Sequence, residues 1–182
     1  RSPWRGDRSK AGSGTLLEHS IHDVDILEWL AGPVATVSAR SANFHGLDGI
    51  EDSVATTIAF SGGGVGTMTS IWHDVLERPS QRRVEIFCER AWVAMHDDDW
   101  WGPVVWTRSG GAHRAVQADA LLDECAARGI EHRNPDGDFI AAVVAGAPAW
   151  PDFADAVRAH ELVDAIYRSC ATGGAPQDVT PT

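Results

Sequence analysis

The chain has 182 residues, enough for a domain with its own hydrophobic core, and 43% of them are hydrophobic. Its formal net charge of -11 argues against a protein that binds the phosphate backbone of nucleic acids, because such proteins need clustered Lys and Arg. No apolar run approaches the roughly 20 residues that span a bilayer, so we expect no membrane segment. The three cysteines form no CxxC pair and indicate reduced structural thiols, which favours a cytoplasmic protein.

The predicted elements are a helix, a run of strands and a final set of helices. Residues 1–13 are polar and predict a loop, and residues 15–31 then predict a helix that Gly32 and Pro33 end. Strand character follows in residues 34–44, 53–60, 65–73, 83–88, 91–95 and 104–107, and helical character in residues 118–128, 136–145 and 152–169. Residues 172–182 predict a loop. This order indicates an α+β fold with an open, predominantly antiparallel or mixed β-sheet.

A nucleotide-binding fingerprint is missing from the sequence. It needs a strand, the motif GxGxxG and then a helix. Gly12 and Gly14 precede a helix but have neither the strand before them nor the third glycine, and the glycines of residues 62–66 lie in a predicted hairpin turn. We therefore expect any dinucleotide to be held mainly by another part of the protein.

The predicted helix at residues 15–31 carries a polar stripe. At about 100° per residue, the side chains of Glu18, His22, Asp25 and Trp29 fall within one narrow arc. The neighbouring arcs are mostly apolar, so we expect the helix to be mostly buried. Buried polar groups need partners, and the stripe therefore needs either internal pairing or a ligand.

Glu18 and His22 are four residues apart, close enough to touch on a helix. A carboxylate beside an imidazole fixes its tautomer, and such a histidine acts as a general acid or base near neutral pH. Asp25, one turn further on, would orient the ring from the other side. Two other interpretations stay open: the side chains satisfy one another in the core, or they bind a metal together with His19. The order HExxH is absent, and we assign no metal ligand.

Motifs along most of the chain add up to a family pattern. They are Trp4-Arg5, Gly12-Ser13-Gly14-Thr15-Leu16-Leu17-Glu18, Ile21-His22-Asp23-Val24-Asp25-Ile26-Leu27, Trp29-Leu30-Ala31-Gly32, Glu51-Asp52 before a strand, Gly66-Thr67 before Trp72, residues 83–87, Phe139-Ile140-Ala141-Ala142 with Gly146 and Pro148, and residues 159–169. This pattern resembles the C-terminal domain of the Gfo/Idh/MocA oxidoreductases. Two departures are that Cys88-Glu89-Arg90 replaces a usual glycine, and that Glu18 stands where many members have Asp.

The resemblance implies helices packed on one face of the sheet, with the other face used for oligomer contacts. It implies that residues 1–182 form a single substrate-binding and oligomerisation domain, a fragment of a longer two-domain chain without its Rossmann half. The implied reaction is hydride transfer between NAD or NADP, bound mainly by the absent half, and a carbinol of a sugar, inositol or related polyol. A Lys of that half commonly assists, and the fragment alone would be inactive.

The resemblance also assigns residues. His22 and Glu18 would be catalytic, while Trp4, Arg5, His19 and Asp25 would bind substrate. The other interpretation of Trp4 and Arg5 is a tryptophan that packs in the fold next to a surface arginine. Residues 97–101 are either a lid or a surface turn. Two alternative functions stay open: a non-catalytic binding or dimerisation module of the same fold, or a metal-dependent hydrolase or isomerase built on the polar stripe.

Overall fold

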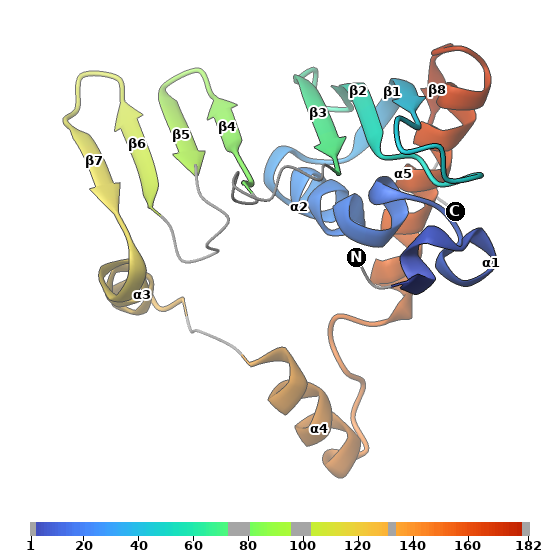
Figure 1. Cartoon of the computed structure of the whole chain (residues 1–182). Helices are drawn as coiled ribbons and strands as arrows, with labels where there is room; N and C mark the ends of the chain where they lie inside the picture. Colours follow the sequence, from blue (N-terminus) through green and yellow to red (C-terminus); the bar gives the residue numbers. More distant parts are fainter. Residues whose placement is uncertain (1–2, 73–80, 96–102, 131–133, 180–182) are drawn as a thin grey trace. The chain divides into compact units, whose positions relative to one another are not determined.

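The structure is a computed structural model that describes residues 3–72, 81–95, 103–130 and 134–179 (Figure 1). Contacts along the chain divide it into two compact units, the first made of Arg1–Asp74 and Trp150–Thr182 and the second of Val75–Ala149. Each unit contains one four-stranded antiparallel sheet. The predicted α+β class and antiparallel pairing are thereby confirmed, with the strands divided between two sheets. The single domain over residues 1–182 stays a prediction.

The first unit brings the two ends of the chain together around one sheet. Its elements are η1 (Pro3–Gly6), α1 (Arg8–Ala11), η2 (Leu16–Ser20), α2 (Ile21–Ala31), β1 (Val34–Ala42), β2 (Ser53–Phe60), β3 (Val65–Ile71), α5 (Phe153–Ala171) and β8 (Gln177–Asp178). The strand order is β3-β2-β1-β8, so the last strand pairs with the first. The hairpin between β2 and β3 turns at Gly63, whose φ of 89° suits glycine.

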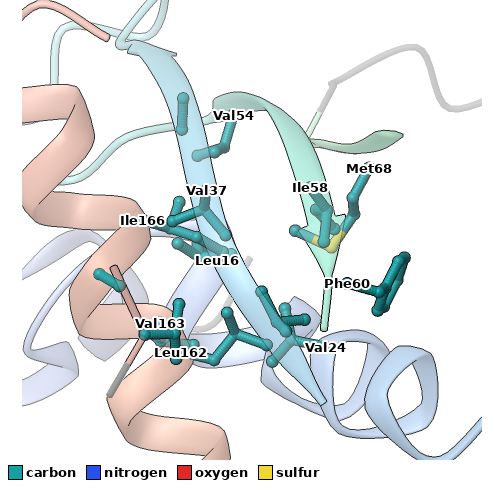
Figure 2. Close-up of a cluster of buried hydrophobic side chains, with 14 residues drawn as sticks. Leu16, Val24, Val37, Val54, Ile58, Phe60, Met68, Leu162, Val163 and Ile166 are labelled. Carbon is teal, nitrogen blue, oxygen red and sulfur yellow. The ribbon is translucent and has the colours of Figure 1, made fainter. Parts of the chain in front are cut away.

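The helices η2, α2 and α5 cover one face of this sheet. Alternate residues of β2 are buried, as expected for a strand with one face on a core. Figure 2 shows the cluster they join, in which Leu16, Val24, Leu162 and Ile166 are fully buried. The apolar stripe of α5 therefore packs on β1 and fixes η2 above the sheet.

The second unit contains the strands β4 (Val84–Phe87), β5 (Ala91–Met95), β6 (Val104–Arg108) and β7 (His113–Val116), in that order across the sheet. The helices α3 (Ala118–Ala127) and α4 (Pro135–Ala145) follow. Each strand pairs antiparallel with its neighbour in sequence. This unit contains none of the predicted site residues.

Several local predictions need correction. The loop predicted at residues 1–13 is wrong, because η1 and α1 lie there and the Asp7 carboxylate caps α1 by accepting from the Ser9 N–H at 3.0 Å. The loop predicted at residues 172–182 contains β8, and β7 was not predicted. The strand β3 ends at Ile71, and residue 73 lies outside the described residues. Residues 97–101, the predicted lid or turn, also lie outside the described residues.

Candidate functional site

The helix predicted at residues 15–31 consists of two pieces with different geometry. Its first turn, η2, is a π-helix, and its remainder, α2, is an α-helix that ends at Gly32 with a φ of 88°. A π-helix closes i→i+5 hydrogen bonds, is rare, and occurs mostly as a single turn inside an α-helix, frequently at functional sites. Glu18 lies within this wide turn, whereas His22 lies in the α-helical part.

A buried hydroxyl cluster accounts for the wide turn. The Ser70 hydroxyl of β3 lies 2.8 Å from Thr15 Oγ1 and accepts a hydrogen bond from Ser20 Oγ at 2.7 Å. All three side chains are buried. On an α-helix, residues five apart point about 140° away from each other. The π turn instead brings Thr15 and Ser20 over the same partner, so the sheet holds η2 at both of its ends.

A second set of contacts holds the residues before and within η2. The Glu51 carboxylate, just before β2, accepts hydrogen bonds from Ser13 Oγ, from the backbone N–H of Gly14 and of Leu16, and from the Tyr167 hydroxyl of α5. No sequence pattern assigns a role to Glu51 or Tyr167. The available signal was the Glu51-Asp52 pair of the family pattern, but no local rule connects it to a helix more than 30 residues away.

Glu18 pairs with Arg5. The Arg5 Nε atom lies 2.8 Å from Glu18 Oε1. The two groups form an ion pair, but the Nε–H bond is not directed at the oxygen well enough to form a hydrogen bond. The Glu18 side chain is only 12% exposed, and the Arg5 side chain is 41% exposed. The second oxygen, Glu18 Oε2, is buried and has no hydrogen-bond partner among the described residues. A buried acceptor without a partner is costly, and a ligand that reached it with a donor would remove that cost.

Trp4 joins the same group. The Arg5 guanidinium carbon lies 5.4 Å from the centre of the Trp4 ring, within the range of a cation–π contact. Trp4 itself is 43% exposed. Three of the predicted site residues, Trp4, Arg5 and Glu18, therefore lie together as a half-exposed indole beside a charged pair.

The other three predicted site residues, His19, His22 and Asp25, are exposed to solvent. In the described part of the chain, no hydrogen bond or ion pair joins His22 to Glu18 or to Asp25. The expected contact between Glu18 and His22 is thus replaced by the pair with Arg5, a residue that a helical-spacing rule does not consider. Beyond the mostly buried Glu18, the polar stripe faces outward, and its last member, Trp29, is 81% exposed. The helix is therefore less buried than its apolar arcs predict.

Asp52, next to Glu51, is a buried carboxylate with a structural role. Its Oδ2 atom lies 2.7 Å from both the backbone N and the ring Nδ1 of His45. Burial by itself would raise the pKa of Asp52, but the backbone N–H groups of His45 and Phe44 and the His45 ring together hold this pKa below its ordinary value. The loop before β2 is thereby fixed next to Glu51.

Within the described ranges, no group of three or more His, Cys, Asp or Glu side chains is arranged to hold a metal ion. Likewise, none of the helices in these ranges is long and apolar enough to cross a membrane.

The family model described as the GFO/IDH/MocA C-terminal domain matches residues 1–94. This match includes η1, η2, α2 and the first sheet hairpin, and covers more than half of the 182 residues. The chain therefore belongs to the Gfo/Idh/MocA family, and the resemblance found in its sequence is confirmed.

Solved structures share the fold at low sequence identity. A levoglucosan dehydrogenase in complex with NADH and levoglucosan has a TM-score of 0.81 and 22% identity, over 99% of this chain and 54% of that chain. A putative oxidoreductase from Thermotoga maritima has a TM-score of 0.77 and 18% identity, over 98% of this chain and 50% of that chain. The WlbA dehydrogenase from Bordetella pertussis, in complex with NADH and UDP-GlcNAcA, has a TM-score of 0.70 and 19% identity, over 97% of this chain and 51% of that chain. The chain thus spans about half the length of each.

Proposed function

We propose that this chain is the substrate-binding half of an NAD(P)-dependent oxidoreductase that acts on a carbinol of a sugar, inositol or related polyol. The observation that carries the proposal is the free, buried Glu18 Oε2 atom one turn before an exposed imidazole, His22, on the same helix. Membership of the Gfo/Idh/MocA family supports it, as do structural neighbours that are dehydrogenases bound to NADH.

The residues divide the chemistry among them. Oxidation of a carbinol removes a hydride from carbon and a proton from oxygen, and the nicotinamide supplies the hydride acceptor when it is bound. His22 takes the hydroxyl proton as a general base, and returns it in the reverse direction. Glu18 Oε2 accepts a hydrogen bond from a substrate hydroxyl, which removes the cost of its unpaired burial. The exposed Trp4 face packs against the C–H surface of the sugar ring.

Arg5, His19 and Asp25 complete the proposed substrate surface. Arg5 fixes the Glu18 carboxylate through its Nε atom and offers its remaining N–H groups to substrate oxygens. His19 and Asp25 are exposed on either side of His22 in sequence and contribute polar contacts at the rim. This arrangement suits a ligand with several hydroxyl groups.

The dinucleotide belongs to another part of the protein in this proposal. The sequence contains no GxGxxG motif; Gly62, Gly63 and Gly64 form the turn between β2 and β3, and Gly66 lies in β3. In this proposal, the chain supplies the substrate side of the active site, namely a general base and hydrogen-bond acceptors for substrate hydroxyl groups. NAD and NADP both fit, because the groups that distinguish them lie beside the dinucleotide.

A homo-oligomer formed through a sheet face is the second part of the proposal. The face of the β3-β2-β1-β8 sheet away from α2 and α5 carries small and hydroxylated exposed side chains, among them Ala55, Thr57, Thr67 and Thr69. A second copy could approach such a face closely. Light scattering of Thr57→Arg, which places a bulky charge there, should show a smaller particle than the parent protein.

The main experiment is a sugar and polyol screen of the full-length protein that contains this chain, followed by nicotinamide absorbance. His22→Ala is expected to lose at least about a hundredfold in turnover, the lower range for a general base. His160→Ala is the matched control, because His160 is an exposed histidine on α5 whose ring, among the described residues, forms a hydrogen bond only with the Ala156 carbonyl. Equal activity of the two variants would remove His22 from the mechanism.

A further inference from the structure

Four consecutive backbone N–H groups at the start of the candidate catalytic helix are bound by one distant pair of residues. In residues 14–17, called here the entry turn, the Gly14 N–H donates to Glu51 Oε2 at 2.8 Å and the Thr15 N–H to the Glu51 carbonyl at 3.0 Å. The Leu16 N–H donates to Glu51 Oε1 at 2.9 Å. The Leu17 N–H donates to the Tyr167 hydroxyl at 3.3 Å, and that hydroxyl donates to Glu51 Oε1 at 2.9 Å.

The first N–H groups of any helix lack partners within the helix and usually find them in a nearby side chain. Here the residue in the capping position, Thr15, makes no capping bond, because its hydroxyl contacts Ser70. Glu51 therefore caps this helix from another element, with a negative charge at the end of the helix that favours one. Burial, and then the nearby Glu51 carboxylate, raise the pKa of Tyr167, so its hydroxyl keeps the proton that it donates.

The contact between the entry turn and Glu51 leaves no space for adjustment. A Cβ atom placed on Gly14 would lie 1.8 Å from the Glu51 carbonyl oxygen and 2.6 Å from its backbone N. Both neighbours are backbone atoms that cannot rotate away. Position 14 therefore accepts no side chain unless the entry turn or the Glu51 backbone moves.

We propose that Glu51 is the positioning residue of this site: by holding the entry turn, it sets where Glu18 and His22 meet the substrate. The proposal rests on the function proposed above. Glu18 directly follows the entry turn, and its own N–H donates to the Gly14 carbonyl at 3.1 Å. His22 lies one turn further along the same helix. A shift of the entry turn is therefore passed on to both side chains.

The effect on rate is expected to be large, because a displacement of about 1 Å at a catalytic group can cost about a hundredfold in rate. Glu51→Gln keeps the size of the side chain but replaces one acceptor oxygen by an NH2 group. That group would face either the Gly14 N–H and Ser13 or the Leu16 N–H and Tyr167, where donors already point. The entry turn loses at least one of its bonds in either orientation.

Glu28→Gln is the matched control. Glu28 is a partly buried carboxylate on α2 that also accepts a backbone N–H, from Val34 at 2.6 Å, and pairs with Arg158 of α5. It ties the far end of the same helix to the same partner helix. Its substitution should destabilise the unit without moving the entry turn.

The test measures three quantities in the full-length protein at a temperature where both variants are folded: hydrogen–deuterium exchange of residues 13–18, kcat, and KM for the sugar. Glu51→Gln is expected to exchange faster and to lose at least about tenfold in kcat, since positioning acts on the reacting geometry. Glu28→Gln is expected to keep its exchange in this segment and its kcat within about twofold.

Unchanged exchange in Glu51→Gln, or faster exchange with kcat kept within about twofold of the parent, would overturn the positioning role. An inactive parent protein has a different meaning, because it refutes the proposed function and with it the catalytic part of this proposal. The exchange data then still decide whether Glu51 holds the entry turn.

Discussion

Arg158 of α5 donates two hydrogen bonds to the Glu28 carboxylate of α2, from Nε to Oε2 at 2.9 Å and from Nη2 to Oε1 at 2.7 Å. This bidentate contact matches the planar guanidinium to the carboxylate and is the strong form of an ion pair. The hydrogen bond to Glu28 is also the main reason why the pKa of Arg158 is raised. The helix that carries the site is thus tied to α5 at its C-terminal end.

Arg158→Met should therefore destabilise the first unit. Among the described residues, the substitution leaves the mostly buried Glu28 carboxylate with only the Val34 N–H as a partner, and an under-satisfied buried acceptor costs about 1–3 kcal/mol. The midpoint of urea unfolding, followed by circular dichroism, measures the loss. Arg128→Met is the control, since Arg128 is an exposed arginine directly after α3 in the other unit and pairs with Glu124. A loss no greater than that of the control would contradict the assignment.

Gly14→Ala tests the close approach of the entry turn to Glu51. The new Cβ atom would meet backbone atoms at 1.8 Å and 2.6 Å, so we expect a loss of at least about 3 kcal/mol, the upper range for overpacking. Gly62→Ala is the matched glycine control, because nothing lies within 4 Å of its Cβ position, and its stability should stay within about 0.5 kcal/mol. Similar thermal midpoints for the two variants would show that this contact has room to relax.

The sequence predicts the strands of the first unit well, because alternation of buried and exposed residues is a local property. The prediction for β2, residues 53–60, agrees with the observed bounds, and the alternation follows the burial of the strand. The two-residue strand β8 was missed because only its pairing with Thr36 and Val37 defines it. No local pattern marks such a strand.

Only part of the candidate site follows from the sequence, because helical spacing is a local property and long-range contacts are not. Helical spacing indicates Glu18 and His22, but it assumes an α-helix where Ser70 holds a π turn and Glu51 binds the first N–H groups. These partners lie 35 or more residues away in sequence. The family pattern supplied Arg5, and the structure adds that it pairs with Glu18. Contacts of this range come from the fold, which spacing rules do not contain.

Asp52 should make stability depend on pH in the acid range. Its pKa is lower in the folded state than the ordinary value of about 3.9 in the unfolded state, so the folded state binds the proton less readily. The resulting stabilisation is fully present above the unfolded pKa and is lost as the pH falls through the folded pKa. Asp52→Asn should cost about 1–3 kcal/mol at pH 7, since it removes the charged acceptor for His45.

Urea midpoints of the parent and Asp52→Asn measured between pH 7 and pH 3 check this prediction, and the gap between them should narrow below about pH 4. Asp164→Asn is the control, because Asp164 is an exposed carboxylate of α5 that pairs with Arg168 four residues later. A gap that stays constant over this pH range would show that the charge of Asp52 does not contribute.

Glu18→Gln tests the free acceptor in the proposed function. Hydrogen bonds to charged groups contribute about 1.5–3 kcal/mol, so kcat/KM for the sugar should fall by about 10- to 100-fold. A deoxy analogue that lacks the contacting hydroxyl should be a poor substrate of the parent. The variant should have only a slightly lower kcat/KM for this analogue than the parent has, because the hydrogen bond that Glu18→Gln removes is already absent. Glu124→Gln of α3, in the other unit, is the control carboxylate. Independent, additive losses from the variant and the analogue would mean that Glu18 contacts no hydroxyl of the substrate.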